Sequence, residues 1–215
     1  MSSRRRRRQR GVSIIVVLLM LLVVSVVALA AARLALLGER GSRADRDRDV
    51  AFQSAENALL DAQRDIEGQT VGAPASVRGI KFCPTSREGF EAGCGATSAS
   101  LGLCDPAADG TQPVWLTAFN DANVATRTVQ YGTYTGQSFV SAAGLGTFAA
   151  ASLPSQPPRY VIEVYADKQF DPNVARAAGG GDQTYFYQIT AVGYGMNAAT
   201  QVMLQETYRA QSSCS

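Results

Sequence analysis

The sequence of 215 residues contains no histidine, and its four cysteines, Cys83, Cys94, Cys104 and Cys214, include no C-x-x-C pair. The first absence excludes Ser-His-Asp triads, Cys-His dyads and histidine-ligated metal sites. The second disfavours a zinc site and a thioredoxin-like redox site. The glycine run at residues 179–181 lacks the Lys-Ser/Thr ending of a phosphate-binding loop. We therefore expect no metal, no cofactor and no enzymatic activity.

Basic charge gathers at the N-terminus. Arg4 to Arg8 form an unbroken run, Arg10 follows, and the remainder of the chain is slightly acidic although the formal net charge is +2. Basic N-terminal segments can bind nucleic acid. Beside a long apolar run, however, such arginines are typical of a positive-inside topology signal. We expect a cytoplasmic N-terminus and no direct contact with nucleic acid.

The apolar run is Val12 to Ala32, in which Ser13 and Ser25 are the polar residues. As a helix this run would rise roughly 32 Å, enough to cross a hydrocarbon core of about 30 Å. Each serine can bond back to a backbone carbonyl within the helix, so neither ends the span. The chain after Ala32 is then exported.

Three kinds of N-terminal segment compete for this run. An ordinary signal peptide would be cut after Ala28-Leu29-Ala30 and would leave Ala31 as the first mature residue. A plain signal anchor would stay uncut, and a prepilin leader would be cut just before the apolar run. The run is longer than the apolar region of about 7 to 15 residues in a signal peptide, which counts against the first alternative.

The helical pattern continues beyond the span, because Arg33 to Glu67 contains no proline and Gly68 supplies a stop. Apolar residues recur at intervals of three and four on one face, which we assign to assembly with other helices: Ala51, Phe52, Ala55, Ala58, Leu59, Ala62 and Ile66. The opposite face is predicted to meet solvent through Asp45, Asp49, Glu56, Asp61 and Arg64. A continuous helix from residue 12 to 67 would be roughly 84 Å long. Such a rod suits packing among similar rods.

Gly38 and Gly41 lie at the join between the two halves of this helix. Each costs about 1 kcal/mol relative to alanine. They are either tolerated weak positions or a point of local unwinding that lets the rod bend or stretch during assembly.

After the helix the composition shifts to Gly, Ala, Ser, Thr and Pro, and residues 71–76 are expected to form a linker. The segment PVWLTAFN, which contains Trp115, predicts a short helix or turn packed on the core. Four cysteines on the exported side predict two disulfides, and three pairings are possible. The pairing we carry forward joins Cys83 to Cys94 and Cys104 to Cys214.

Strand signals concentrate near the C-terminus. Residues 159–165, 184–192 and 200–209 are rich in β-branched and aromatic side chains, with a long loop at 167–183 between the first two segments. They predict an antiparallel sheet that buries one face against the helix. The expected fold class is therefore α+β, a long N-terminal helix that carries an antiparallel sheet head.

Two segments resemble known pilin sequences. Residues 9–15, QRGVSII, resemble a class III prepilin signal, in which a dedicated aspartic peptidase cuts after the glycine and methylates the new N-terminus. This resemblance implies a cut between Gly11 and Val12. The run DRDVAFQSAE at Asp47 to Glu56, together with the ending from residue 187 to 208, resembles the PilX-type minor pilins of the type IV pilus. The middle of the chain is largely unmatched.

The resemblance implies four parts, which are a leader at 1–11, a transmembrane half-helix at 12–32, an amphipathic half-helix at 33–67 and a disulfide-containing head at 68–215. It implies a single-pass inner-membrane protein, with its head in the periplasm, that later enters the extracellular pilus. The implied partners are the prepilin peptidase, the inner-membrane assembly platform, the major pilin, other minor pilins and a tip adhesin. Adhesion, aggregation, twitching motility and DNA uptake are family roles that the sequence does not separate.

Val16 departs from the pilin pattern. Most pilins carry a glutamate at the fifth mature position, which is Val16 when counted from Val12. In a major pilin that glutamate neutralises the terminal amine of the neighbouring subunit already in the filament, and a carboxylate in lipid is costly without such a partner. Either the valine indicates a place at or near the filament tip, in a priming complex, or it has no positional meaning.

Two other classes of function stay open at this point. A periplasmic enzyme could use paired carboxylates such as Glu163 and Asp167, although solvated surface charge explains both residues equally well. A single-pass, membrane-anchored periplasmic binding protein unrelated to pili would also fit the apolar run.

Overall fold

The computed structural model describes residues 12–69, 71, 78, 82–120, 124–142, 152–167 and 184–210. The chain divides into two compact units, residues 1–46 and 47–215. Four predicted features lie wholly or mostly outside the described residues: the leader, the linker at 71–76, the loop at 167–183 and Cys214.

Helix α1 runs from Val12 to Ile66, within one residue of its predicted end. Gly38 and Gly41 lie inside it in helical conformation, and a Cβ at either position would meet nothing within 4 Å. In the described part of the chain α1 is the helix long and apolar enough to cross a membrane, with a mean hydropathy of 3.3 in its apolar window. Residues 14–46 are exposed throughout, so no described part of the chain covers this segment.

The second unit contains a mixed sheet in the order β1-β2-β4-β5-β6, with β3 paired to β4. The strands are β1 Glu91–Ala92, β2 Leu103–Asp105, β3 Val129–Gln130, β4 Arg159–Ala166, β5 Tyr185–Tyr194 and β6 Gln201–Tyr208. Two short helices, α2 Val114–Asn120 and α3 Val124–Arg127, lie between β2 and β3 in the sequence. Helix α2 confirms the short helix predicted around Trp115.

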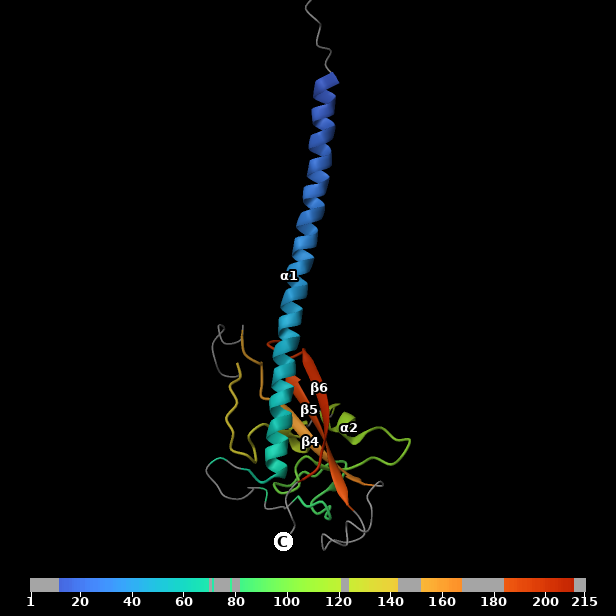
Figure 1. The fold of residues 1–215 in the computed structure, drawn as a ribbon, viewed down its shortest axis with the longest axis vertical. Coiled ribbons are helices and arrows are strands. Elements are labelled where there is room, and N and C mark those ends of the chain that lie inside the picture. The colour runs from blue at the N-terminus through green and yellow to red at the C-terminus, as the bar shows by residue number, and fades with distance from the viewer. Residues whose placement is uncertain are drawn as a thin grey trace, which may run out of the picture. The chain divides into compact units, whose positions relative to one another are not determined.

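The last three strands form the predicted antiparallel meander (Figure 1). The prediction missed β3, which pairs antiparallel to β4, and it also missed β1 and β2, which pair parallel to each other, while β2 also pairs parallel to β4. These two strands have two and three residues and lie in a glycine-rich stretch. A period of two residues cannot be recognised in segments so short.

One face of the sheet packs against residues 51–66 of α1 (Figure 1). Alternate residues of the central strands supply this core, which includes Ala58, Ala62, Ile66, Tyr160, Ile162, Tyr187, Ile189 and Ala191. The other face is covered by a second cluster, in which Val114 and Ala118 of α2 pack with Val161 and the cysteines Cys94 and Cys104. The sheet is therefore buried on both sides around β4.

Helix α1 and strand β5 lie close together at Gly193. A Cβ on this residue would overlap the carbonyl oxygen of Ala51 and the backbone nitrogen of Ala55. Both alanines are fully buried. Small residues on the two elements thus allow backbone to meet backbone.

We expect Gly193→Ala to push β5 away from α1 and to lower the free energy of unfolding by about 1–3 kcal/mol, the usual cost of overpacking. Chemical denaturation of the full-length protein in detergent measures this change. Gly38→Ala is the matched control, because its new methyl group enters open space and should leave the unfolding of the head unchanged. Equal stability of the Gly193 variant and the wild type would contradict this account.

Candidate functional site

The predicted assembly face of α1 is largely covered by the head of the same chain. Five of its seven residues are at most 2% exposed: Ala51, Ala55, Ala58, Ala62 and Ile66. Leu59 is half-buried, whereas Phe52 is 43% exposed. Leu60, which was not predicted, is 47% exposed. The large apolar side chains that another subunit can reach on this part of the helix are therefore Phe52 and Leu60.

Asp61 is fully buried, so its predicted exposure to solvent is wrong. It lies three residues after Ala58, which places it on the covered face. Its carboxylate accepts a hydrogen bond from the Gly132 backbone N–H at 2.7 Å and another from the Thr135 hydroxyl. Burial raises the pKa of Asp61, although both hydrogen bonds oppose the rise. Of the other predicted polar residues, three are exposed and one is half-buried, namely Asp45, Asp49, Glu56 and Arg64.

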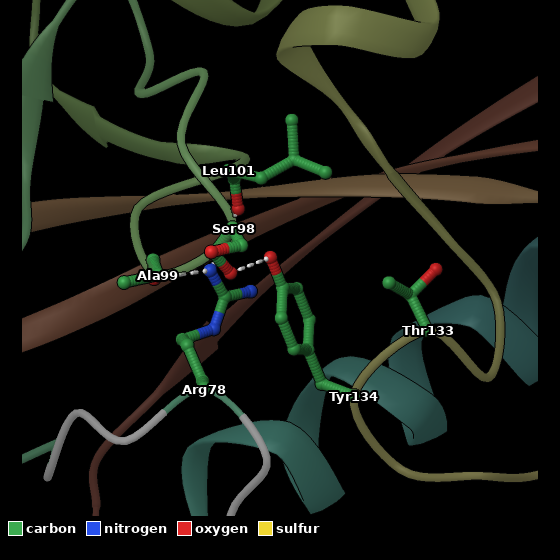
Figure 2. Close-up of a pocket in the computed structure, with 6 residues that line it drawn as sticks. All are labelled: Arg78, Ser98, Ala99, Leu101, Thr133 and Tyr134. Carbon is green, nitrogen blue, oxygen red and sulfur yellow. Dashed lines mark hydrogen bonds between the residues drawn. The ribbon is translucent and has the colours of Figure 1, made fainter.

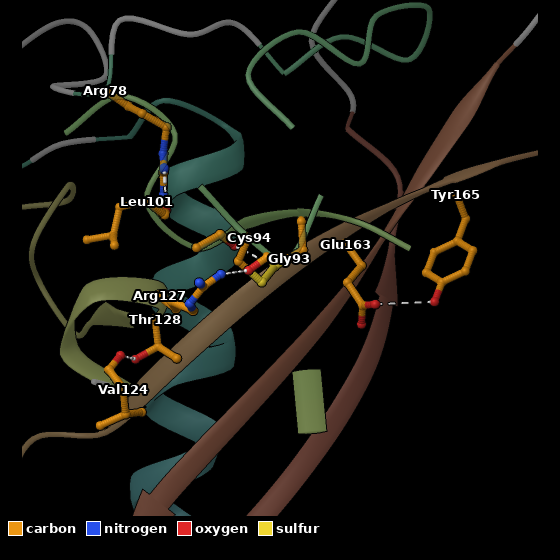
Figure 3. Close-up of a disulfide and its surroundings, with 11 residues drawn as sticks. Arg78, Gly93, Cys94, Leu101, Val124, Arg127, Thr128, Glu163 and Tyr165 are labelled. Carbon is orange, nitrogen blue, oxygen red and sulfur yellow. Dashed lines mark hydrogen bonds between the residues drawn. A yellow bond between two sulfur atoms is a disulfide. The ribbon is translucent and has the colours of Figure 1, made fainter. Parts of the chain in front are cut away.

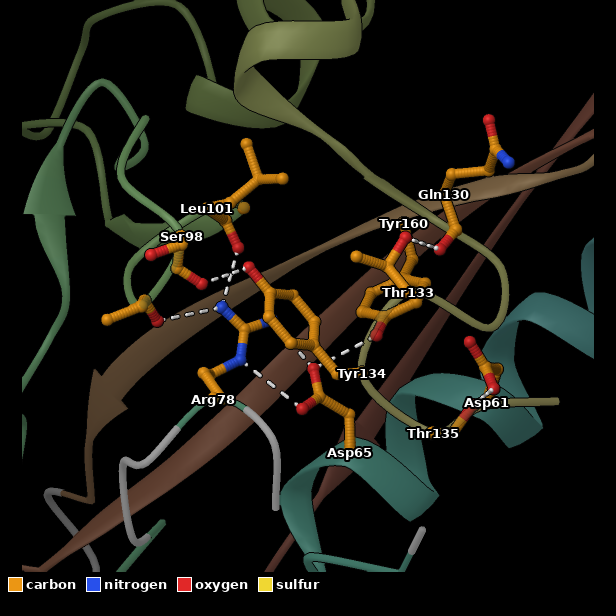
Figure 4. A network of polar contacts seen from close by, with 12 residues as sticks. Asp61, Asp65, Arg78, Ser98, Leu101, Gln130, Thr133, Tyr134, Thr135 and Tyr160 are labelled. Atoms are coloured by element: carbon orange, nitrogen blue, oxygen red, sulfur yellow. Dashed lines mark hydrogen bonds and ion pairs between the residues drawn. The ribbon is translucent and has the colours of Figure 1, made fainter. Parts of the chain in front are cut away.

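Asp65 binds two parts of the head directly and a third through Arg78 (Figure 4). Its carboxylate accepts two hydrogen bonds from Arg78, one from Nε at 3.2 Å and one from Nη2 at 2.7 Å. Both side chains are fully buried. The Tyr160 hydroxyl of β4 donates to the same carboxylate at 2.9 Å. Nη1 of Arg78 donates to the carbonyl oxygens of Ala99 at 3.1 Å and Leu101 at 2.7 Å. One helix carboxylate thus joins residue 78, the loop before β2 and the sheet.

The charges in this network favour the ion pair. Burial lowers the pKa of Arg78, but the adjacent Asp65 carboxylate outweighs burial and raises it above the ordinary value. Burial and the same carboxylate raise the pKa of Tyr160 well above its ordinary value. The arginine therefore stays charged, and the tyrosine stays a neutral hydrogen-bond donor.

A pocket of about 390 Å³ lies beside this network, lined by Arg78, Ser98, Ala99, Leu101, Thr133 and Tyr134 (Figure 2). The guanidinium carbon of Arg78 is 3.7 Å from the Tyr134 ring centroid. The Tyr134 hydroxyl donates to the Ser98 carbonyl oxygen at 2.6 Å. Because the protein itself engages these polar groups, the arrangement holds loops together.

Asp47 begins the DRDVAFQSAE run and holds the turn between β5 and β6. Its carboxylate accepts a hydrogen bond from the Asn197 backbone N–H at 3.1 Å and one from the Thr200 hydroxyl at 2.5 Å. A Cβ at Gly195 would overlap the same aspartate. The structure thus gives this run a definite role in seating the hairpin on the helix.

The predicted disulfide pairing is wrong, because Cys94 is bonded to Cys104 (Figure 3). Gly95 donates to the Leu103 carbonyl at 3.0 Å, and Gly102 donates to the Gly95 carbonyl at 3.2 Å. These bonds close the intervening loop and bring the two cysteine Cα atoms to 4.0 Å. Cys83 is also disulfide-bonded.

The carboxylates considered for an enzyme have separate partners. Glu163 is buried within β4, and Asp167 pairs with Arg209 at 2.7 Å. Among the described residues, no group of three or more His, Cys, Asp or Glu side chains could hold a metal ion. At the N-terminus, Gly11 lies outside the described residues, Val12 begins α1 and Val16 is 50% exposed.

We expect Arg78→Met to leave Asp65 buried without a countercharge and to lower the free energy of unfolding by about 3–5 kcal/mol. Thermal and chemical denaturation measure the loss. Arg43→Met is the matched control, because it breaks the exposed pair with Glu39, whose side chains are 79% and 58% exposed for the arginine and the glutamate. That variant should show no measurable change. Similar losses in both variants would argue against a special role of the buried pair.

Comparison with known families agrees with this geometry. A family model described as PilX N-terminal matches residues 10–59, and one described as type IV pilus assembly protein PilX C-term matches residues 100–210. No curated protein and no solved structure matches the chain. The first match contains Asp47, Ala51, Ala55 and Ala58 of the helix contact with the head, and the second contains strands β2 to β6. The chain therefore belongs to the PilX family of type IV pilus assembly proteins, as a minor pilin.

Proposed function

We propose that this minor pilin takes its place at or near the tip of the type IV pilus, in a priming complex with other minor pilins. Val16 is the observation that supports this placement. It lies on the exposed, apolar part of α1, at the fifth position counted from Val12. A pilin usually carries its glutamate there.

The energetics of a charge in the membrane explain why this position matters. A carboxylate at the centre of the hydrocarbon costs on the order of 3 kcal/mol unless a partner compensates it. In a shaft subunit the partner is the terminal amine of the subunit above. A tip subunit has no subunit above it, so replacing the glutamate by valine removes no interaction there. Its own amine at Val12 can still pair with the glutamate of the subunit below.

The contribution to assembly is helix packing without catalysis. Residues 14–46 of α1 are exposed and mostly apolar in their first half, and Phe52 and Leu60 extend the accessible apolar surface beyond them. The partners on this proposal are the major pilin, other minor pilins, the assembly platform and a tip adhesin. The arginines at Arg4 to Arg8 hold the N-terminus in the cytoplasm, and a disulfide in the head suits the periplasm.

Processing at the prepilin site is the first requirement. We expect protein extracted from membranes to begin at Val12 with a methylated amine, because residues 9–15, QRGVSII, resemble a prepilin signal that is cut after the glycine. Mass spectrometry of the N-terminal peptide measures this directly. A first residue at Ala31, or an intact Met1, would contradict processing as a pilin.

The tip placement is tested by Val16→Glu. A new carboxylate at this position can pair with the amine of another subunit, so the variant should move from the tip into the shaft and lower the number of pili. Immunogold labelling of the head and pilus counts measure both effects. Val17→Glu is the matched control, because it adds the same charge one residue away from the pairing position. Wild-type labelling and pilus number in the Val16 variant would refute the positional role, while the family assignment would stand.

A further inference from the structure

A buried carboxyl group with an unpartnered oxygen lies on the sheet face opposite α1. Glu163 of β4 is 1% exposed. Its Oε1 accepts a 3.4 Å hydrogen bond from the Tyr165 hydroxyl, and its Oε2 has no hydrogen-bond partner in the described part of the chain. Tyr165 itself is stacked on Phe186, with ring centroids 5.7 Å apart.

The disulfide loop and α2 cover this region of the sheet. Glu163 is in register with Cys104 of β2 on one side and with Gln188 of β5 on the other. Cys104 is bonded to Cys94, and Figure 3 shows Glu163 between this disulfide and Tyr165. Helix α2 packs on Val161, two residues earlier on the same face. We call the loop at residues 93–104 together with α2 the cover.

No charge near Glu163 compensates its ionised form among the described residues. On β4 the neighbouring ionisable group is Tyr165, and β5 presents the neutral Gln188. Asp105 of β2 is engaged in a separate ion pair, and Arg127 of α3 donates to a backbone carbonyl of the cover. Burial therefore raises the pKa of Glu163 to about 7. The hydrogen bond from Tyr165 lowers this pKa, but burial has the larger effect.

We propose that Glu163 makes the cover a pH-dependent element of the head. When the carboxyl is protonated it stays buried and the cover stays closed on β4. When it loses its proton, the uncompensated charge draws water, because burying an isolated carboxylate is far more costly than burying the acid. The cover then loosens and exposes the apolar cluster between α2 and the sheet.

The direction of the effect follows from proton linkage. The folded protein binds this proton more tightly than the unfolded chain, whose carboxyl has an ordinary pKa of 4.5. The stabilising contribution of Glu163 is therefore complete below pH 4.5, declines as the pH rises and is lost above about pH 7. The head is most tightly closed in acidic surroundings. This inference does not depend on the proposed tip placement.

Trp115 is the single tryptophan and packs, partly buried, against the cluster beneath the cover. Its fluorescence in the full-length protein in detergent therefore reports the closure. Between about pH 5.5 and 8.5 we expect its emission to shift to longer wavelength and its quenching by acrylamide to increase, with a midpoint near the pKa of Glu163. Glu163→Gln keeps the shape of the protonated acid and should abolish both changes.

Glu206→Gln is the matched control, because Glu206 is half-buried on β6 and bonded to Gln63 on the far side of the sheet. That variant should keep the wild-type response. A wild-type signal that is flat across this pH range, or an unchanged response in Glu163→Gln, would overturn the proposal. If Glu163→Gln does not fold, the midpoint of the fluorescence change in Tyr165→Phe provides the test. Loss of the hydroxyl that stabilises the carboxylate must raise the midpoint, and a midpoint that stays or falls overturns the proposal.

Discussion

The contact between residues 51–66 of α1 and the sheet determines how the rest of the head is built. Alanines at helical spacing allow β5 to come so close that Gly193 has no room for a side chain. This approach carries Asp61 and Asp65 under the head, where each binds backbone or side chains from distant segments. The alanines therefore set the distance between helix and sheet, and the buried carboxylates determine which loops attach to it.

One helix cannot offer the same face to its own head and to a neighbouring subunit. The alanine stripe is taken up by the sheet, so the accessible apolar groups on this part of the helix are Phe52 and Leu60. The period of three and four residues correctly predicts that a face is buried, but it carries no information about what buries it. In a protein that both folds and assembles through one helix, the two partners must take different faces.

The sequence predicts the long elements well and the contacts between distant residues poorly. Helix α1 and strands β4 to β6 each span at least eight residues, enough for their periods to show. The Cys94–Cys104 pairing depends on backbone bonds between Gly95 and Leu103, which no spacing rule indicates. The sequence did contain a pattern from which the buried pair of Asp65 and Arg78 could have been predicted. Asp65 falls three residues after Ala62 and seven after Ala58, and an acidic residue on an apolar stripe predicts a buried partner such as Arg78.

Asp61, Asp65 and Glu163 are all buried, yet the protein compensates them in different ways. Asp65 has a full countercharge in Arg78, and Asp61 has hydrogen bonds from an amide and a hydroxyl. Glu163 has one long hydrogen bond and an unpartnered oxygen. Burial alone therefore does not determine how a carboxyl group behaves. Glu163 has the least compensation, and burial raises its pKa to about 7, so the covered face of the sheet carries a carboxyl group that titrates near neutral pH.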